Sequence, residues 1–350
     1  MSVSPLQSAI RRLAAGESLS AADTMQAFAV IMRGEASDAQ VAALLMALRV
    51  KGETAEEVAG GALALRNAMV KLPARDPARL VDTCGTGGGK VPTFNISTAA
   101  ALLAAGAGVR IAKHGNRSFT SRCGSADVLE ALGVPVEITR DAMSFTLDHA
   151  GIVFMFAPIM HPAMKHVGPV RRELGIPTVM NVLGPLANPA GAGRQVVGVA
   201  EPHRMHLLAG ALAALGTVRA LVVHGEPGLD EVSPLGCTSV REVRDGAVRE
   251  WTIDPAHYDL DVTNSADLAG GTPSENARVI VDVLSGRLGG GARAAVVLNA
   301  AAALYVSAED MSYDEAIGNA QRALQNEAGL GALERLREAV RQCVSRSVRQ

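Results

Sequence analysis

The 350-residue sequence has few aromatic side chains, few cysteines and little net charge. Because only 3% of its residues are Phe, Trp or Tyr, we expect a core of Ala, Leu and Val in helices that pack closely around a sheet. The cysteines form no C-x-x-C pair and no zinc-like spacing, which excludes a disulfide scaffold and fits a reduced cytoplasmic enzyme. They are Cys84, Cys123, Cys237 and Cys343.

The net charge of −2 argues against general nucleic-acid binding, which requires a basic face. The chain has no run of 18 consecutive apolar residues, and residues 1–11 lack the hydrophobic core of a signal peptide. We therefore expect a cytoplasmic protein with neither a nucleic-acid partner nor a membrane association. Its length is sufficient for two domains.

Residues 1–72 predict a small α-helical domain, since short helical segments follow one another without a strand pattern between them. Ser37 with Gln40, and Thr54 with Glu57, have the spacing of capping boxes ahead of apolar helical stretches. Residues 72–80 contain two prolines and no periodicity, which predicts a linker.

The following part, residues 80–350, predicts a larger α/β domain with a mostly parallel central sheet, because apolar strands alternate with helices. We expect strands at 80–83, 109–112, 134–138, 152–156, 195–199 and 219–224, and helices at 96–106, 125–132, 140–149, 162–174 and 203–215. Asp245-Gly246 predicts a hairpin, and after Pro273 the pattern is helical again, ending in one long segment over 312–342.

A glycine-rich turn at Gly85, Gly87, Gly88 and Gly89 follows the first of these strands. Its bare backbone N–H groups could bind a phosphate, but a tight strand-to-helix turn with incidental glycines explains the same pattern. A Walker A loop would need Ser or Thr where Val91 stands, and a dinucleotide fingerprint would need a glycine at Lys90. Both of those readings are therefore weak.

The helix after this turn begins among four polar residues, Thr93, Asn95, Ser97 and Thr98. One such residue suffices to cap a helix, so the surplus suits phosphate oxygens or a metal ion. The stretch Lys113 to Ser118 places two cations at the end of another strand. Since ligands of open α/β sheets bind beyond the carboxyl ends of strands, both stretches should face one crevice, although a solvated loop remains the alternative.

Asp230 and Glu231 follow a third strand, and adjacent carboxylates near a phosphate suggest Mg²⁺. Two solvated acids in a loop are the alternative reading. Arg171 has the planar fork that binds a carboxylate bidentately, unless it is a surface cation of its helix. His161, which precedes Pro162, is expected to start a helix rather than to bind a ligand.

Several motifs together resemble the anthranilate phosphoribosyltransferase family, in register over nearly the whole chain. They are GTGG (85–88), TFNIST (93–98), KHGNRS (113–118), GSADVLEALG (124–133), HPAMK (161–165), NVLGPLANP (181–189), LDEVS (229–233) and NAAAALYV (299–306). KHGNRS, in place of K-H-S-T-G-G, separates the chain from the pyrimidine nucleoside phosphorylases, which share the architecture.

The resemblance implies a small α-helical domain that includes added helix from about 165–190, a larger α/β domain with the site in the cleft, and a homodimer. It implies transfer of the 5-phosphoribosyl group from 5-phosphoribosyl pyrophosphate (PRPP) to anthranilate in tryptophan biosynthesis. The amine of anthranilate is neutral and nucleophilic at pH 7, so the difficult step is departure of pyrophosphate.

By motif position, the resemblance assigns three groups of residues. PRPP would meet Gly85, Gly88, Gly89, Thr93, Asn95, Ile96, Ser97, Thr98, Lys113, His114, Gly115, Asn116, Arg117, Ser118, Ser121 and Ser125. Two Mg²⁺ per subunit would be held with Ser97, Asp230 and Glu231. Asn116 and Arg171 would meet anthranilate, with Arg171 on its carboxylate and Gly85 in the same channel; Lys113, Asn116 and Arg171 would act in the reaction.

One position departs from the family pattern, which usually has Asp where this chain has Gly89, followed here by Lys90. The difference bears on how many metal ions are bound and on the affinity for PRPP. Lys90 would either face the pyrophosphate or be solvated. Two rival functions remain open at this point. One is an enzyme of the same architecture with another acceptor, such as a pyrimidine phosphorylase-like protein, and the other is a relative that has lost catalysis and binds nucleic acid.

Overall fold

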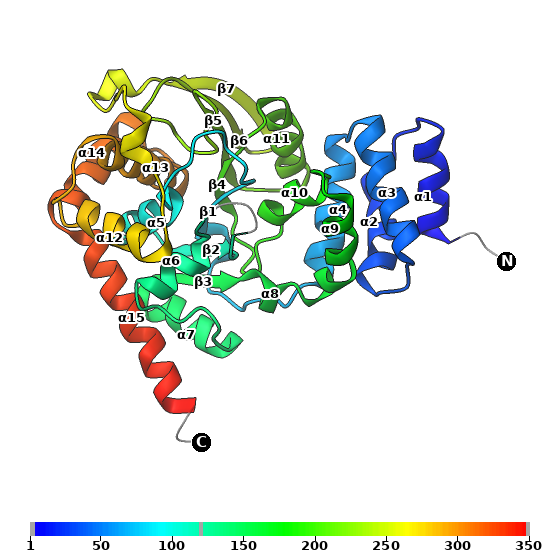
Figure 1. Cartoon of the computed structure of the whole chain (residues 1–350), viewed down its shortest axis with the longest axis horizontal. Helices are drawn as coiled ribbons and strands as arrows, with labels where there is room; N and C mark the ends of the chain where they lie inside the picture. Colours follow the sequence, from blue (N-terminus) through cyan, green and yellow to red (C-terminus); the bar gives the residue numbers. More distant parts are fainter. Residues whose placement is uncertain (1–3, 119–121, 348–350) are drawn as a thin grey trace.

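The computed structural model describes residues 4–118 and 122–347, and it has a helical bundle beside a larger α/β unit (Figure 1). The bundle consists of α1 (Pro5–Ala14), α2 (Ala21–Met32), α3 (Asp38–Lys51) and α4 (Ala55–Ala68). Both predicted capping boxes are confirmed: Ser37 and Gln40 begin α3, and Thr54 and Glu57 begin α4. These reciprocal hydrogen bonds satisfy N–H groups that the first turn of a helix leaves free.

The α/β unit is built on a sheet in the order β3-β2-β1-β4-β5-β6-β7 in the described part of the chain. Its strands are β1 (Val81–Gly85), β2 (Ile111–Gly115), β3 (Ile152–Phe156), β4 (Arg194–Gly198), β5 (Arg219–Gly225), β6 (Thr238–Arg244) and β7 (Ala247–Ile253). Strands β1 to β5 are parallel, whereas β6 and β7 form the predicted antiparallel hairpin at Asp245-Gly246. The mostly parallel sheet is thus confirmed.

Helices cover both faces of this sheet (Figure 1). The longer ones are α5 (Ile96–Gly106), α6 (Ser125–Ala131), α7 (Arg140–Ala150), α11 (Met205–Ala214), α12 (Pro273–Leu284), α13 (Gly290–Ser307), α14 (Tyr313–Gln325) and α15 (Ala328–Ser347). In the described chain, α13 alone is long and apolar enough to cross a membrane, but 78% of that stretch is buried inside the protein, as in a core helix.

Three details of the prediction are wrong. Residues 134–138 bury Val134, Val136 and Ile138 alternately, as a strand would, but their backbone joins no strand of the sheet. The helix expected over 162–174 is a short 3₁₀ turn, Pro162–His166, followed by α9 (Gly168–Leu174). The segment 312–342 is two helices, because the chain turns at Glu327, whose φ is +51°.

The buried hydrophobic residues of the described chain form two clusters, and both include residues of β4 and β5. One joins α1–α4 to residues of α9 and of α10 (Met180–Leu183), and extends to α11 and to β4 and β5. The other joins α5, α13, α14 and α15 to β1, β2 and β3. The chain order reverses between β1 and β4, and such a switch point in an open sheet is where ligands bind.

Candidate active site

The carboxyl end of the sheet is crossed by the loop that follows β5. Asp230 of this loop accepts a hydrogen bond from the backbone N–H of Gly87 at 2.9 Å. A Cβ at Gly85 would lie 2.9 Å from Asp230 Oδ2, and a Cβ at Gly89 would lie 2.8 Å from Oδ1. The two glycines therefore let the carboxylate approach the turn closely, so that the glycine turn and Asp230 form one site.

Lys113, the central residue of β2, joins this site to the start of α5. Its ammonium group is buried and donates to the backbone oxygen and hydroxyl of Thr83 and, at 3.2 Å, to Ser97 Oγ. Burial lowers the pKa of Lys113, while the carboxylate of Asp82 acts in the opposite direction. The two predicted stretches, one on each side of α5, do meet in the structure.

Asp230 and Glu231 are neighbouring carboxylates in surroundings that disfavour negative charge. Burial raises the pKa of Asp230, and burial together with Asp230 raises the pKa of Glu231 to about 8. A divalent cation would remove this cost, so the pair fits Mg²⁺. Among residues 4–118 and 122–347 there is no group of three or more His, Cys, Asp or Glu suited to a metal, so further ligands would come from hydroxyls, water or substrate oxygens.

The first turn of α5 is not capped by the residue that precedes it. Asn95 occupies the N-cap position, but its amide donates to Cys123 O at 3.2 Å and accepts from Asn276 Nδ2 at 2.9 Å. Thr98 Oγ1 is buried and has no hydrogen-bond partner in the described structure. The backbone N–H groups of Ile96 and Thr98 donate to Phe94 O and Asn95 O. The backbone N–H of Ser97 donates to the carboxylate of Glu231, so the hydroxyl of Thr98 is what this helix start offers to a ligand. Simple capping by Asn95 is thus the wrong explanation for this polar cluster.

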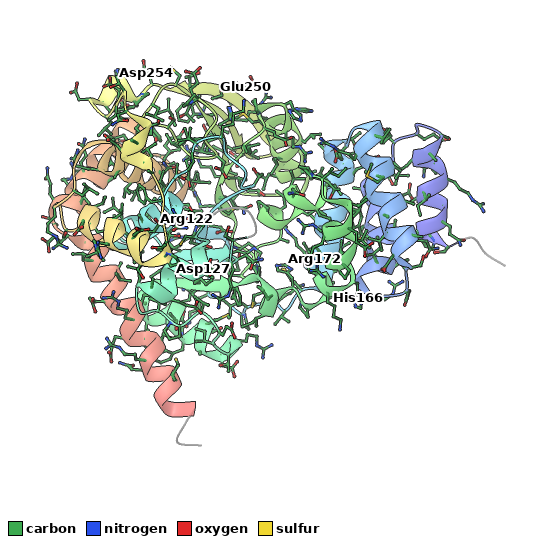
Figure 2. All side chains as sticks on the ribbon, in the orientation of Figure 1. Arg122, Asp127, His166, Arg172, Glu250 and Asp254 are labelled. Carbon is green, nitrogen blue, oxygen red and sulfur yellow. The ribbon has the colours of Figure 1, made fainter. Side chains whose placement is uncertain are left out.

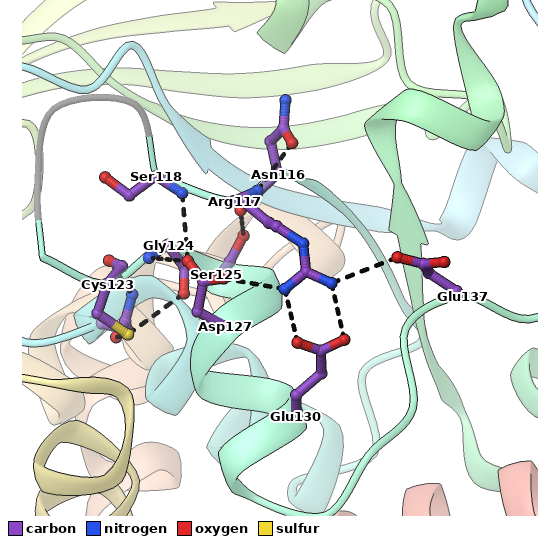
Figure 3. Close-up of polar contacts among 10 residues, drawn as sticks. Asn116, Arg117, Ser118, Cys123, Gly124, Ser125, Asp127, Glu130 and Glu137 are labelled. Atoms are coloured by element: carbon purple, nitrogen blue, oxygen red, sulfur yellow. Dashed lines mark hydrogen bonds and ion pairs between the residues drawn. The ribbon is translucent and has the colours of Figure 1, made fainter.

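The loop after β2 turns toward α6 rather than continuing along the strand. Figure 3 shows the guanidinium of Arg117 paired with Glu130 at 2.6 Å, Asp127 at 3.0 Å and Glu137 at 3.3 Å. The backbone N–H of Ser118 donates to Asp127 Oδ2 at 3.2 Å. The backbone N–H of Arg117 donates to Asn116 Oδ1 at 2.8 Å, so both its guanidinium and its backbone N–H are already engaged in this conformation. Ser121 lies outside the described residues.

Asn116 takes a different direction from Arg117. Its backbone oxygen accepts from Ser125 Oγ at 3.2 Å, and its side-chain amide nitrogen points away from the ion pairs of Arg117 (Figure 3). Gly115 is needed here because a Cβ would overlap with Ser125 Oγ and the ring of Phe154. The amide oxygen of Asn116 accepts from the backbone N–H of Arg117, so its amide nitrogen is the part available to a ligand.

His114 lies against His161, with ring centroids 4.8 Å apart. Burial lowers the pKa of His114 to about 3 and the pKa of His161 to about 4, so both rings are neutral at pH 7. As predicted, His161 stands at the start of a helical turn, Pro162–His166. Neither ring supplies positive charge to a phosphate.

Arg171 belongs to α9, on the helical side of the molecule. Figure 2 shows its neighbours His166 and Arg172 on that side, and Arg122 and Asp127 on the α/β side. Arg171 is partly buried, burial lowers its pKa, and it forms no ion pair with a described residue. An incompletely solvated guanidinium of this kind is suited to a carboxylate ligand.

The remaining predicted residues lie in or beside the same loops. Gly88 has a φ of +84°, which only glycine adopts readily, and Thr93 precedes α5. Ile96 begins α5, but its side chain is buried in the core, so only its backbone can face a ligand. Thr83, Asp82 and Asn188 were missed by the sequence reasoning. An acidic residue inside the apolar strand 80–83 was the available signal for Asp82.

Comparison with known proteins agrees with this architecture. Residues 7–69 match the family model "Glycosyl transferase family, helical bundle domain", and residues 77–330 match "Glycosyl transferase family, a/b domain". The chain is 49% identical to an anthranilate phosphoribosyltransferase of Rubrobacter xylanophilus over 341 residues, which are 97% of this chain and 99% of the relative.

Solved structures give the same result. The anthranilate phosphoribosyltransferase of Thermus thermophilus superposes with a TM-score of 0.89 at 41% identity, covering 95% of this chain and 99% of that one. The Saccharomyces cerevisiae enzyme in complex with PRPP and Mg has a TM-score of 0.87 at 30% identity, covering 97% and 99%. The chain therefore belongs to the anthranilate phosphoribosyltransferase family.

Proposed function

We propose that this chain transfers the 5-phosphoribosyl group of PRPP to the amine of anthranilate, giving N-(5-phosphoribosyl)anthranilate and pyrophosphate in tryptophan biosynthesis. The observation that supports this most is the meeting of the glycine turn, the polar start of α5 and Lys113 at one edge of the sheet. That edge offers backbone N–H groups, hydroxyls and a cation to a phosphorylated donor.

The donor is held by the turn residues Gly85, Gly88 and Gly89, by the start of α5, and by the loop after β2. Lys113 neutralises phosphate charge, and the backbone N–H groups of Gly88 and Gly89 are directed at the leaving pyrophosphate, since that of Gly87 is bonded to Asp230. Negative charge grows on that group as its bond to ribose C1 breaks, so fixed donors at this place lower the barrier.

Ser97, Asp230 and Glu231 are the residues that would hold Mg²⁺. When bound, the cation supplies charge neutralisation to the pyrophosphate, and the proposal has two ions per subunit. Asp230 is held beside the glycine turn by the backbone N–H of Gly87.

The acceptor is held from both sides of the molecule. Arg171 binds the carboxylate of anthranilate and Asn116 contacts the same molecule, so its neutral amine is turned toward ribose C1. Because this amine is already nucleophilic, positioning supplies what a strong base would otherwise provide.

The proposal extends to the organisation of the protein. The helical domain comprises residues 1–72 with added helix from about 165–190, and the α/β domain comprises residues 80–350. Packing of α9 and α10 with the bundle supports this division. The protein acts as a cytoplasmic homodimer, which sedimentation of the purified chain tests.

Product analysis separates this function from a related enzyme with another acceptor. The chain is incubated with PRPP and Mg²⁺, and with anthranilate or a pyrimidine base, and the products are identified by mass spectrometry. We expect N-(5-phosphoribosyl)anthranilate with anthranilate and no ribosylated pyrimidine. A ribosylated pyrimidine as the main product would overturn the proposed acceptor.

A further inference from the structure

Strands β1 and β2 separate before they reach the site. All of β1, from Val81 to Gly85, pairs with β4, whereas in the described chain its register with β2 is confined to Val81 opposite Ile111. Beyond this point the backbone groups of β2 that face β1 must find other partners, because unpaired buried backbone groups are costly. Pairing between β1 and β2 therefore does not by itself fix the position of Lys113 and the residues that follow it.

Two buried side chains supply those partners. Asp82 Oδ1 accepts from the backbone N–H of His114 at 3.1 Å, and Asn188 Nδ2 donates to the backbone oxygen of Ala112 at 2.8 Å. Asn188 Nδ2 also donates to Asp82 Oδ2 at 2.8 Å, which joins the two residues. The two residues of β2 that they bind, Ala112 and His114, flank Lys113, the cation of the site. Asp82 and Asn188 are themselves at most 3% exposed.

Asn188 belongs to a segment that is itself tied to the helical bundle. Arg66 of α4 donates to Leu186 O at 2.7 Å, and the backbone N–H of Leu72, in the connection after α4, donates to Pro189 O at 2.9 Å. Asn188 Oδ1 accepts from the backbone N–H of Ala190 at 2.9 Å, which fixes the orientation of its amide. Hydrogen bonds from α4 and from Leu72 thus hold the segment 186–189, and Asn188 of that segment is bonded to β2.

We propose that Asp82 and Asn188 are positioning residues for the transfer reaction. They hold Lys113 and the residues after it at a fixed distance from the glycine turn of β1 and from the helical side that carries Arg171. Neither residue touches a substrate. This inference rests on the proposed function, because it assigns the consequence of misplacement to donor binding.

Steady-state kinetics of Asn188→Ala, with Gln195→Ala as the matched control, test the proposal. Gln195 is equally buried and donates to Pro185 O in the same segment at 2.8 Å, but its side chain is not bonded to β2. We expect Asn188→Ala to raise the KM for PRPP about 10- to 100-fold, since displacement of a binding group by an ångström has effects of that size. Gln195→Ala should lower the melting temperature and leave that KM unchanged.

Exchanging the two groups gives a rescue test. In Asp82→Asn, whichever way the new amide turns, one of its sides meets another donor, so the KM for PRPP should rise. In the double variant Asp82→Asn with Asn188→Asp, the amide at 82 can accept from His114 and donate to position 188, while the donation to Ala112 O stays lost, so only part of the affinity should return. An unchanged KM in Asn188→Ala, or an equal rise in Gln195→Ala, would overturn the proposal.

Hydrogen exchange separates this outcome from failure of the proposed function. We expect faster exchange in the peptide that contains residues 111–116 in Asn188→Ala but not in Gln195→Ala. This measurement needs no substrate. Unchanged exchange would therefore contradict the positioning role even if the chain proved to transfer no phosphoribosyl group, whereas faster exchange in an inactive chain would count only against the function.

Discussion

Lys113 is a cation that folding has buried, and its present partners are the oxygens of Thr83 and Ser97. We expect Lys113→Ala to lower turnover mainly by weakening donor binding. The KM for PRPP should rise roughly 10- to 100-fold, as for the loss of a hydrogen bond to a charged group. Steady-state kinetics with varied PRPP measure this. An affinity for PRPP equal to that of the unchanged chain would remove Lys113 from the donor site.

Arg171 and Arg172 are neighbours in α9 that differ in surroundings. Arg171 is partly buried, whereas Arg172 is exposed. We expect Arg171→Ala to raise the KM for anthranilate about 10- to 100-fold by removing a charge-assisted carboxylate contact. Arg172→Ala is the matched control and should leave it unchanged. If both variants keep the original KM for anthranilate, Arg171 has no part in acceptor binding.

Single residues were predictable where the chemistry is local. Asp230 follows β5, Ser97 opens α5 and Lys113 lies within β2, and a parallel sheet brings such positions toward one edge. The partners of Arg117 were not predictable, because its ion pairs depend on how α6 packs. The link between Asp82 and Asn188 joins positions 106 residues apart, which no spacing rule contains.

At the scale of elements, the glycine turn and the loop after β5 behave as one unit, and Gly89 is its most informative position. A Cβ there would lie 2.8 Å from Asp230 Oδ1. We expect Gly89→Asp to place a third carboxylate beside two whose pKa values are already raised. The metal-free variant should melt a few degrees lower, and Mg²⁺ should restore the loss.

Gly89→Asn, which has the same shape and no charge, is the control for this substitution. Its melting temperature should respond to Mg²⁺ as that of the unchanged chain does. Activity titrated against Mg²⁺ should reach half its maximum at a lower concentration in Gly89→Asp. Superimposable Mg²⁺ profiles for all three chains would show that this position is indifferent to the metal.

Elements with a complete local signal were predicted well. Capping boxes located α3 and α4, and Asp245-Gly246 located the β6–β7 hairpin, where both residues have positive φ. The strand predicted at 134–138 was wrong because alternating burial shows only that one face of the segment packs against the core, and does not show pairing with another strand. The single helix predicted at 162–174 was wrong because the apolar periodicity continues across the break between the 3₁₀ turn and α9.

At the scale of the whole molecule, the buried Asp82 should affect how stability depends on pH. Burial raises its pKa from 3.8 to about 6. Between these values the unfolded chain has lost the proton and the folded chain retains it, so the free energy of unfolding falls as pH rises. Asp82→Asn lacks this titration, and its stability relative to the unchanged chain should improve by about 2 kcal/mol between pH 4 and 6.

Urea unfolding of both chains at several pH values measures this difference. The comparison cancels the contributions of other titrating groups that the two chains share. A difference in unfolding free energy that stays constant from pH 4 to pH 7 would mean that Asp82 keeps an ordinary pKa in the folded protein.

The two-part organisation of the molecule was predictable because helical patterning without strands gives way to strand–helix alternation near residue 80. The hydrogen bonds that connect the two parts were not predictable from the sequence. The hydrogen bonds from Arg66 to Leu186 O and from Leu72 to Pro189 O involve backbone oxygens, which any residue type provides. Contacts of this kind leave no compositional trace, so they had to be seen in the structure.

The central claim is that one edge of the sheet joins PRPP to anthranilate, and the fluorescence of anthranilate tests it most directly. The purified chain is mixed with anthranilate, PRPP and Mg²⁺, and the loss of fluorescence is followed with time. We predict a decrease that requires the protein, PRPP and Mg²⁺ together and that slows in Lys113→Ala and Arg171→Ala. No decrease at any Mg²⁺ concentration would contradict the account.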